Sequence, residues 1–256
     1  ALVLKRRGFD VHLFDDQKIL GGTLNVADKG YGKEKITRYT ESLVAQVTQA
    51  GIILHRSHPA TPQTIRDLAP CGIFIACGAR PLIPDIPGID DPRVVCAEAI
   101  LTGKKSVSGQ VVVVGTGMTG LETAEVLAMV GCTLTLVEML PAPGPGVYPS
   151  VVKDVLSRIE PHRPKILLEH KLVAIDQEGV VLKSLKEGVR VHVPAQAIVL
   201  ALGVRPRLEV AKTFSKAFPD IPVIPVGDAL QGGRILEATR SAHGRAFTFT
   251  PQGEEV

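Results

Sequence analysis

The chain has 256 residues, enough for one large α/β domain or two smaller ones with a substantial core. Apolar residues make up 45% and charged residues 21%, a globular composition that argues against disorder. The net charge is only +3, the basic residues are scattered, and there is no Trp and only three Tyr, so we expect no nucleic-acid partner.

The sequence shows neither membrane-spanning segments nor a disulfide framework. No apolar run approaches the ~20 residues needed to cross a bilayer, and no signal peptide is evident, so we expect no membrane association. The four cysteines at 71, 77, 96 and 132 form no CxxC pair, and the last three lie in or beside apolar runs. We therefore expect a cytoplasmic protein with reduced thiols.

The first part of the chain alternates short strands with helices. Apolar spacing predicts strands at 11–15, 52–54 and 72–76, and helices at 34–50 and from Pro62 onward. The run at 72–76 is continuously apolar, which is typical of a strand buried on both faces, and it ends in Cys77-Gly78. Four prolines from 81 to 92 then predict an extended connection, and we expect the chain to cross between domains near Gly103.

A second βαβ unit follows this connection. Valines at 111–114 predict a buried strand, the loop 115–120 contains three glycines, and a helix at 121–130 and a strand at 133–138 complete the unit. Further elements are predicted as a helix at 151–159, strands at 165–168 and 197–201, an antiparallel meander at 172–175, 180–183 and 189–193, a strand at 222–226 and a final helix at 234–247. We therefore expect an α/β fold with two Rossmann-like halves and an antiparallel β-meander.

The glycine loop carries the strongest chemical signal. Gly115 allows a tight turn, Gly117 lets the backbone approach a pyrophosphate, and Gly120 permits close packing of helix on strand. A GxGxxG pattern alone can be a turn without a ligand, but this one directly follows a buried strand and directly opens a helix. This context favours a dinucleotide site.

Residues around the loop extend this prediction. Met118 and Thr119 lie at the start of the helix, where free N–H groups and the helix dipole favour phosphate. Glu138 ends the next strand, where a carboxylate can accept hydrogen bonds from ribose hydroxyls and would repel a 2′-phosphate. Gly203, in a small-residue turn after another buried strand, belongs to the same predicted site. The pattern favours NAD(H) over NADP(H).

Other polar residues give weaker signals. We identify no catalytic acid–base pair or nucleophile. His55 and His58 have HxxH spacing but no acidic or cysteine partner nearby in sequence, so we expect no metal site. Asp15 at a strand end and Asp228 before the last helix can each be an ordinary polar terminus or a helix N-cap.

In combination, these segments resemble a known family. The resemblance rests on Gly21-Gly22-Thr23-Leu24, residues 76–81, 87–89 and 120–125, and Gly227-Asp228, which are similar to its GGQL, ATGARP, PGI, GLETAE and GD motifs. Over nearly its whole length the chain resembles flavoproteins with two dinucleotide-binding domains. More narrowly, it looks like the C-terminal part of NADH:flavin oxidoreductases related to 2,4-dienoyl-CoA reductase, 2-enoate reductase and trimethylamine dehydrogenase.

The resemblance implies that an NAD(H)-binding half, residues 104–203, is inserted into an FAD-binding half, residues 1–103 and 204–256. Asp15 would meet the ribose of the FAD adenosine, and Asp228 the ribityl or pyrophosphate region. The residues it assigns to FAD are Asp15, Gly21, Gly22, Thr23, Leu24, Cys77, Gly78, Gly227 and Asp228. In an intact parent, NADH would reduce FAD, and electrons would pass through a 4Fe-4S centre to FMN in a barrel that reduces an enoate- or enoyl-type substrate.

Departures from the family pattern limit this interpretation. The family's first glycine fingerprint should lie just before Ala1, so we expect that upstream sequence is missing and that this chain binds FAD poorly or not at all. FMN and the 4Fe-4S centre are expected only in the missing barrel domain. The four cysteines of this chain are dispersed, so no cluster can be assigned to them.

Three hypotheses stay open: an electron-input module that is inactive alone, a truncated stand-alone NADH oxidase or ferredoxin-reductase-like enzyme, and a non-catalytic dinucleotide-binding or structural module. A homo-oligomer also stays open.

Overall fold

In the computed structural model, which describes residues 1–251, the chain folds into two compact units. Unit 1 contains residues 1–25, 34–80 and those from Val204 onward, and unit 2 contains Val26–Lys33 and Pro81–Gly203. Unit 2 is therefore inserted into unit 1, with one short and one long segment. The α/β class with a parallel sheet and an antiparallel meander is confirmed.

The crossing into the long segment of unit 2 lies at Pro81, whereas we expected it near Gly103. The reason is a strand and a helix that the sequence pattern did not reveal, β5 (Val94–Cys96) and α5 (Ala97–Leu101). Strand β5 pairs in parallel with β12 (Ala197–Leu200), and α5 contributes Ala97 and Ile100 to the core beside that strand. Residues 81–103 therefore belong to unit 2.

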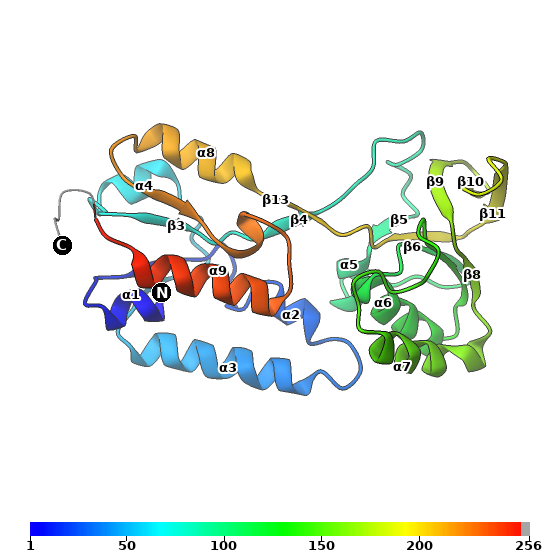
Figure 1. The fold of residues 1–256 in the computed structure, drawn as a ribbon, viewed down its shortest axis with the longest axis horizontal. Helices are drawn as coiled ribbons and strands as arrows, with labels where there is room; N and C mark the ends of the chain where they lie inside the picture. The colour runs from blue at the N-terminus through cyan, green and yellow to red at the C-terminus, as the bar shows by residue number, and fades with distance from the viewer. Residues whose placement is uncertain (252–256) are drawn as a thin grey trace. The chain divides into compact units, whose positions relative to one another are not determined.

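Unit 2 consists of three layers (Figure 1). Its middle layer is a five-stranded parallel sheet in the order β5-β12-β6-β7-β8. The remaining strands of this sheet are β6 (Gln110–Val114), β7 (Thr133–Val137) and β8 (Lys165–Leu167). Helices α5, α6 (Met118–Met129) and α7 (Pro149–Ile159) form a second layer, and the 3-10 helix η1 (Glu160–His162) follows α7. The third layer is the predicted meander of β9 (His170–Ile175), β10 (Gly179–Ser184) and β11 (Arg190–Pro194).

The valines of β6 show how the layers are held together. Val111 and Val113 belong to the cluster that includes α6, whereas Val112 and Val114 belong to the cluster that includes the meander. All four side chains are at most 4% exposed. Because successive side chains of a strand point to opposite faces, a run of four valines predicts a strand covered on both sides, and the structure confirms it.

Unit 1 contains two separate two-stranded parallel sheets. Strand β1 (His12–Phe14) pairs with β2 (Ile53–His55), and β3 (Ile73–Ile75) pairs with β14 (Val223–Pro225). Within the described residues, β1 and β3 do not pair with each other, so each keeps an edge without a strand partner. The helices of this unit are α1 (Leu2–Arg6), α3 (Glu34–Gln49), α4 (Pro62–Arg66), α8 (Leu208–Ala217), the 3-10 helix η2 (Gly227–Ala229) and α9 (Ile235–Thr248).

Short elements lie where the chain passes between the units. Helix α2 (Leu24–Ala27) spans the first crossing, and β4 (Ala79–Pro81) pairs with β13 (Val204–Pro206) at the later ones. Neither these elements nor α8 was predicted from the sequence. Helix α8 buries Phe214 beside Ile73 and Ile75, so it covers the β3–β14 sheet.

Candidate functional site

The glycine loop has steric reasons for two of its glycines. Gly115 follows β6 with φ +96°, in the left-handed region, and a Cβ there would lie 2.4 Å from the carbonyl oxygen of Ala201. At Gly120, on the first turn of α6, a Cβ would lie 2.0 Å from the carbonyl oxygen of Gly115. These two positions exclude larger residues because strand, loop and helix are packed together.

Gly117 has no such internal reason. It is the N-cap of α6 with φ −59°, which any residue can adopt, and a Cβ there would meet nothing within 4 Å. No side chain caps α6 in the described structure, so its first N–H groups, including those of Met118 and Thr119, have no side-chain acceptor. An open backbone surface with free helical N–H groups fits a phosphate ligand.

Glu138, directly after β7, points into the glycine loop. Its Oε2 accepts hydrogen bonds from the backbone N and from Oγ1 of Thr116, each at 2.9 Å, and its Oε1 accepts from the backbone N of Leu140 at 3.0 Å. Glu138 is 5% exposed and Thr116 is fully buried. The structure therefore brings the predicted ribose-binding carboxylate and the predicted phosphate loop into direct contact.

The proline-rich loop after Glu138 is attached to Thr116. Gly144 donates its backbone N–H to the carbonyl oxygen of Thr116 at 2.9 Å and lies 3.3 Å from the Thr116 Oγ1. Gly144 has φ +72°, and a Cβ there would lie 2.3 Å from Val152 Cγ2, so glycine is required for this loop to fold over α7. Thr116 thus joins three segments, although the sequence did not single it out.

Gly203 lies at the same edge of the sheet. It follows β12 with φ +87°, and its carbonyl oxygen accepts a hydrogen bond from Leu82 N at 2.9 Å. Since β6, β7 and β12 are parallel neighbours, their carboxyl ends meet at one edge, where open α/β sheets bind their ligands. The residues that we assigned to NAD from the sequence all lie along this edge.

Two buried acids on α6 form ion pairs that sequence reasoning missed. Lys33 Nζ lies 2.8 Å from Glu122 Oε1, and Arg158 pairs with Glu125 and with Asp154. Arg158 also lies over the ring of Tyr31, 4.8 Å from its centroid. The sequence signal for the ion pairs of Glu122 and Glu125 is that acidic residues on an otherwise apolar helix need partners. The contacts of Lys33 with Glu122 and of Tyr31 with Arg158 attach residues 26–33 to the rest of unit 2.

In unit 1, Asp15 and the loop at 21–24 follow β1. Asp15 Oδ1 accepts from the backbone N of Gln17 at 2.8 Å, as an ordinary turn acceptor does. Gly21 has φ +124°, and a Cβ there would lie 2.7 Å from Asn25 Oδ1 and from Thr40 Cγ2. Gly22 has φ +51° and open space at its Cβ position, Thr23 is exposed, and Leu24 opens α2.

The other predicted FAD residues meet at the carboxyl ends of β3 and β14. Because Ile75 is aligned with Pro225, the turns Cys77-Gly78 and Gly227-Asp228 leave the same end of this sheet. Asp228 lies in η2 and accepts a hydrogen bond from Gly233 N at 3.1 Å, whereas the N-cap of α9 is Arg234. Asp228 therefore does not cap the last helix. No strand pairing joins this pair of turns to β1 within the described residues.

Histidines cluster on the β1–β2 sheet. His12 Nδ1 lies 3.0 Å from His55 Nε2, and the ring of Phe14 stacks on His55 with centroids 4.1 Å apart. Burial lowers the pKa of His55, and the charges of His12 and His58 add to this effect. In the described part of the chain, no group of three or more His, Cys, Asp or Glu is arranged to hold a metal ion.

Three of the four thiols, those of Cys77, Cys96 and Cys132, are not activated. Burial raises the pKa of the Cys77 thiol, and it does the same for Cys96 and Cys132. A raised pKa keeps a thiol protonated and weakly nucleophilic at neutral pH. Cys77 therefore has the environment of a structural cysteine.

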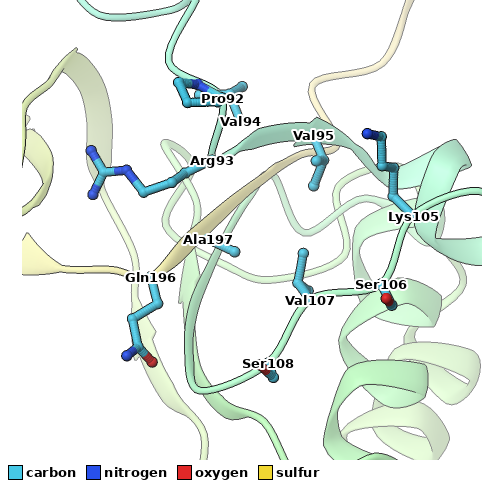
Figure 2. A pocket seen from close by; sticks show the side chains of 10 residues that line it. All are labelled: Pro92, Arg93, Val94, Val95, Lys105, Ser106, Val107, Ser108, Gln196 and Ala197. Atoms are coloured by element: carbon cyan, nitrogen blue, oxygen red, sulfur yellow. The ribbon is translucent and has the colours of Figure 1, made fainter.

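A hollow of about 490 Å³ lies at the amino ends of β5, β6 and β12, the end of the sheet opposite to the glycine loop. Figure 2 shows the side chains that line it. Arg93, which lines the hollow, already forms hydrogen bonds with other residues of unit 2. The guanidinium donates to Asp91 and to the carbonyl oxygens of Gln177 at 3.0 Å and Ala195 at 3.1 Å. Its hydrogen bonds lower the pKa of Asp91 to about 2. Arg93 thus connects three segments of unit 2 beside the hollow.

A larger cavity of about 1050 Å³ lies between the proline-rich loop, α7 and β8. Its wall consists mainly of proline and aliphatic side chains, such as Pro143, Val147 and Leu156. It lies beside the loop that follows Glu138 but contains none of the predicted site residues. This cavity therefore does not coincide with the predicted site.

The comparison with protein families decides the identity of the fold. Residues 1–220 match the family model of the pyridine nucleotide-disulphide oxidoreductases. The chain belongs to this family. It is therefore an oxidoreductase-type domain of the class that binds nicotinamide dinucleotide and flavin.

Among the described residues, no helix is both long and apolar enough to cross a membrane.

Relatives of this pyridine nucleotide-disulphide oxidoreductase domain are longer proteins. It is 32% identical to an NADH oxidase of Thermoanaerobacter brockii over 94% of the chain and 37% of the relative. It is 27% identical to a cinnamate reductase of Clostridium sporogenes over 95% of the chain and 36% of the relative. The chain thus spans about a third of the length of these proteins.

Solved structures agree on the fold. The domain superposes on 2-naphthoyl-CoA reductase with a TM-score of 0.88 and 25% identity, covering 97% of this chain and 37% of that one. It superposes on histamine dehydrogenase of Rhizobium sp. 4-9 with a TM-score of 0.84 and 20% identity, covering 100% and 43%. The second likeness shows the fold alone.

Proposed function

We propose that the chain is the electron-input module of a larger flavin oxidoreductase, in which unit 2 binds NADH in preference to NADPH and unit 1 contributes to an FAD site. The observation that supports this most directly is the carboxyl edge of the sheet in unit 2. There, the uncapped start of α6 and the open backbone at Gly117 lie beside the buried carboxylate of Glu138.

The chain's own groups have distinct tasks in this proposal. Gly117, Met118 and Thr119 offer backbone N–H groups to a pyrophosphate, and Glu138 accepts a ribose hydroxyl while repelling a 2′-phosphate. Gly203 lines the same edge. When bound, NADH supplies a hydride and FAD accepts it, so the protein contributes binding and orientation.

Unit 1 supports FAD binding at two places. Gly22 and Gly78 have left-handed φ values of +51° and +70°, and each has open space at its Cβ position, so a ligand can approach the backbone. We assign to FAD the loop at 21–24 with Asp15, and the turns Cys77-Gly78 and Gly227-Asp228 at the carboxyl ends of β3 and β14. The residues proposed to bind FAD thus lie in unit 1, and those proposed to bind NADH lie in unit 2.

The proposal also covers the part of the whole protein that lies outside this chain. Relatives that match the chain over about a third of their length are named NADH oxidase, bilirubin reductase and cinnamate reductase. Since the shared part is similar while these names differ, we infer that the substrate is determined outside it. We propose that the remaining part carries FMN and a 4Fe-4S centre and reduces an enoate- or enoyl-type substrate.

A titration of the chain with NADH and NADPH tests the proposal. The fluorescence of NADH itself reports binding, without background from tryptophan, because the chain contains none. We expect saturable binding that favours NADH, loss of this preference in Glu138→Ala, and unchanged binding in Glu187→Ala, which removes an exposed carboxylate of the meander. If the chain binds neither dinucleotide, the proposal is wrong.

A further inference from the structure

Thr116 is the second residue of the glycine loop, and it is fully buried between the loop and Glu138. Its backbone N and its Oγ1 both donate to one oxygen of the Glu138 carboxylate, Oε2, at 2.9 Å. Two donors from a single residue fix this oxygen in position, while Leu140 N fixes the other oxygen at 3.0 Å. The carboxylate is thus held from both sides by groups of the chain itself.

The hydroxyl of Thr116 is bound on both sides as well. It donates to Glu138 and lies 3.3 Å from the donating backbone N of Gly144. A hydroxyl can donate and accept at the same time, whereas a methyl group can do neither. The hydroxyl of Thr116 thus adds a side-chain connection between Glu138 and the loop that follows it to the two backbone hydrogen bonds of residue 116.

We propose that Thr116 is the positioning residue that sets the selectivity of unit 2 for NADH over NADPH. It does so by holding the Glu138 carboxylate against the glycine loop, where the adenosine ribose must lie if the phosphates bind at α6. This inference rests on the proposed function. A carboxylate held in place cannot turn away from a 2′-phosphate, so the repulsion is retained in full.

Thr116→Val separates the hydroxyl from the rest of the network. Valine has nearly the same shape, and two backbone hydrogen bonds remain, from position 116 N to Glu138 Oε2 and from Gly144 N to the carbonyl oxygen of residue 116. The fold is therefore retained, but the carboxylate loses one of its three donors. Thr116→Ser keeps the hydroxyl and is the matched control, and Thr116→Ala removes it without placing a methyl group beside the carboxylate.

The test measures the dissociation constants of NADH and NADPH for the full chain and the three variants, with thermal unfolding as a check on folding. We expect the ratio of the NADPH to the NADH dissociation constant to fall about tenfold in Thr116→Val and Thr116→Ala, the order of one hydrogen bond to a charged group. Thr116→Ser should keep the ratio of the unmodified chain.

Two results would overturn the inference. The ratio could stay unchanged in Thr116→Val and Thr116→Ala, also when both dinucleotides weaken by the same factor, which indicates a purely structural role. Alternatively, the ratio could fall equally in Thr116→Ser. An unmodified chain that binds neither dinucleotide refutes the proposed function as well. An unmodified chain that prefers NADH while Thr116→Val keeps its ratio refutes only the role of Thr116.

Discussion

Replacing Gly120 by alanine tests the steric account of the glycine loop. The new Cβ would lie 2.0 Å from the carbonyl oxygen of Gly115 and 3.2 Å from the Cβ of Ala201. Since a carbon–oxygen contact needs about 3.3 Å, helix α6 and the loop must separate by about 1 Å. The backbone atoms that collide cannot rotate away, so the strain passes to the packing of the whole helix.

The energetic cost follows from what α6 buries. Ala124, Leu127 and Ala128 are at most 2% exposed and belong to the same core cluster as Val111 and Val113. A gap of about 1 Å forfeits a substantial part of their dispersion energy, and overpacking costs about 1–3 kcal/mol or more. The better helix propensity of alanine returns up to about 1 kcal/mol. We expect a net loss of about 2 kcal/mol, which lowers Tm by about 4–8 °C.

Gly117→Ala is the matched control, because its φ of −59° suits alanine and its Cβ would meet nothing within 4 Å. Thermal and urea unfolding followed by far-UV circular dichroism should show a change within about 0.5 kcal/mol for Gly117→Ala. This variant should nevertheless bind NADH more weakly, since its methyl group occupies the space of the phosphate. A Tm of Gly120→Ala equal to that of the unmodified chain, or an equal loss in both variants, would refute the reasoning.

Two further predictions concern charged groups. Arg158→Gln should destabilise the chain by about 2 kcal/mol in urea unfolding, because it leaves the buried carboxylate of Glu125 without its partner, whereas Asp154→Asn at an exposed pair should cost less than about 0.5 kcal/mol. An equal effect of both substitutions would contradict this expectation. Because the pKa of His55 is lower in the folded chain than in the unfolded chain, the unfolded chain takes up the His55 proton at a higher pH. The contribution of neutral His55 to the free energy of unfolding is therefore complete above about pH 6.5 and is lost as the pH falls through the folded pKa. NMR titration should give a His55 pKa below 6.5 that rises in His12→Asn, and a pKa at or above 6.5 would show that the cluster does not act in this way.

The elements that were predicted correctly have local causes. A valine run marks β6, helical spacing marks α3 and α7, and alternating strands with intervening glycines mark the meander. Helix α8, with ten residues, was missed as well, but the other missed elements, such as β5 with three residues and α5 with five, are short. Segments of this length show no periodicity, and β5 exists because it pairs with β12, about a hundred residues further along the chain.

The candidate site divides in the same way. The sequence by itself determined the glycine loop and Glu138, because a tight turn, a close backbone approach and a strand-ending carboxylate each require particular residue types at fixed spacing. Only the tertiary structure decided that Thr116 holds Glu138, since its partner lies 22 residues away and many residues suit that loop position locally. Likewise, the ion pairs of Glu122 with Lys33 and of Glu125 with Arg158 depend on where distant segments return to α6. Backbone conformation is a local property of the chain, whereas the partner of a buried polar group is chosen by the packing of segments far apart in sequence.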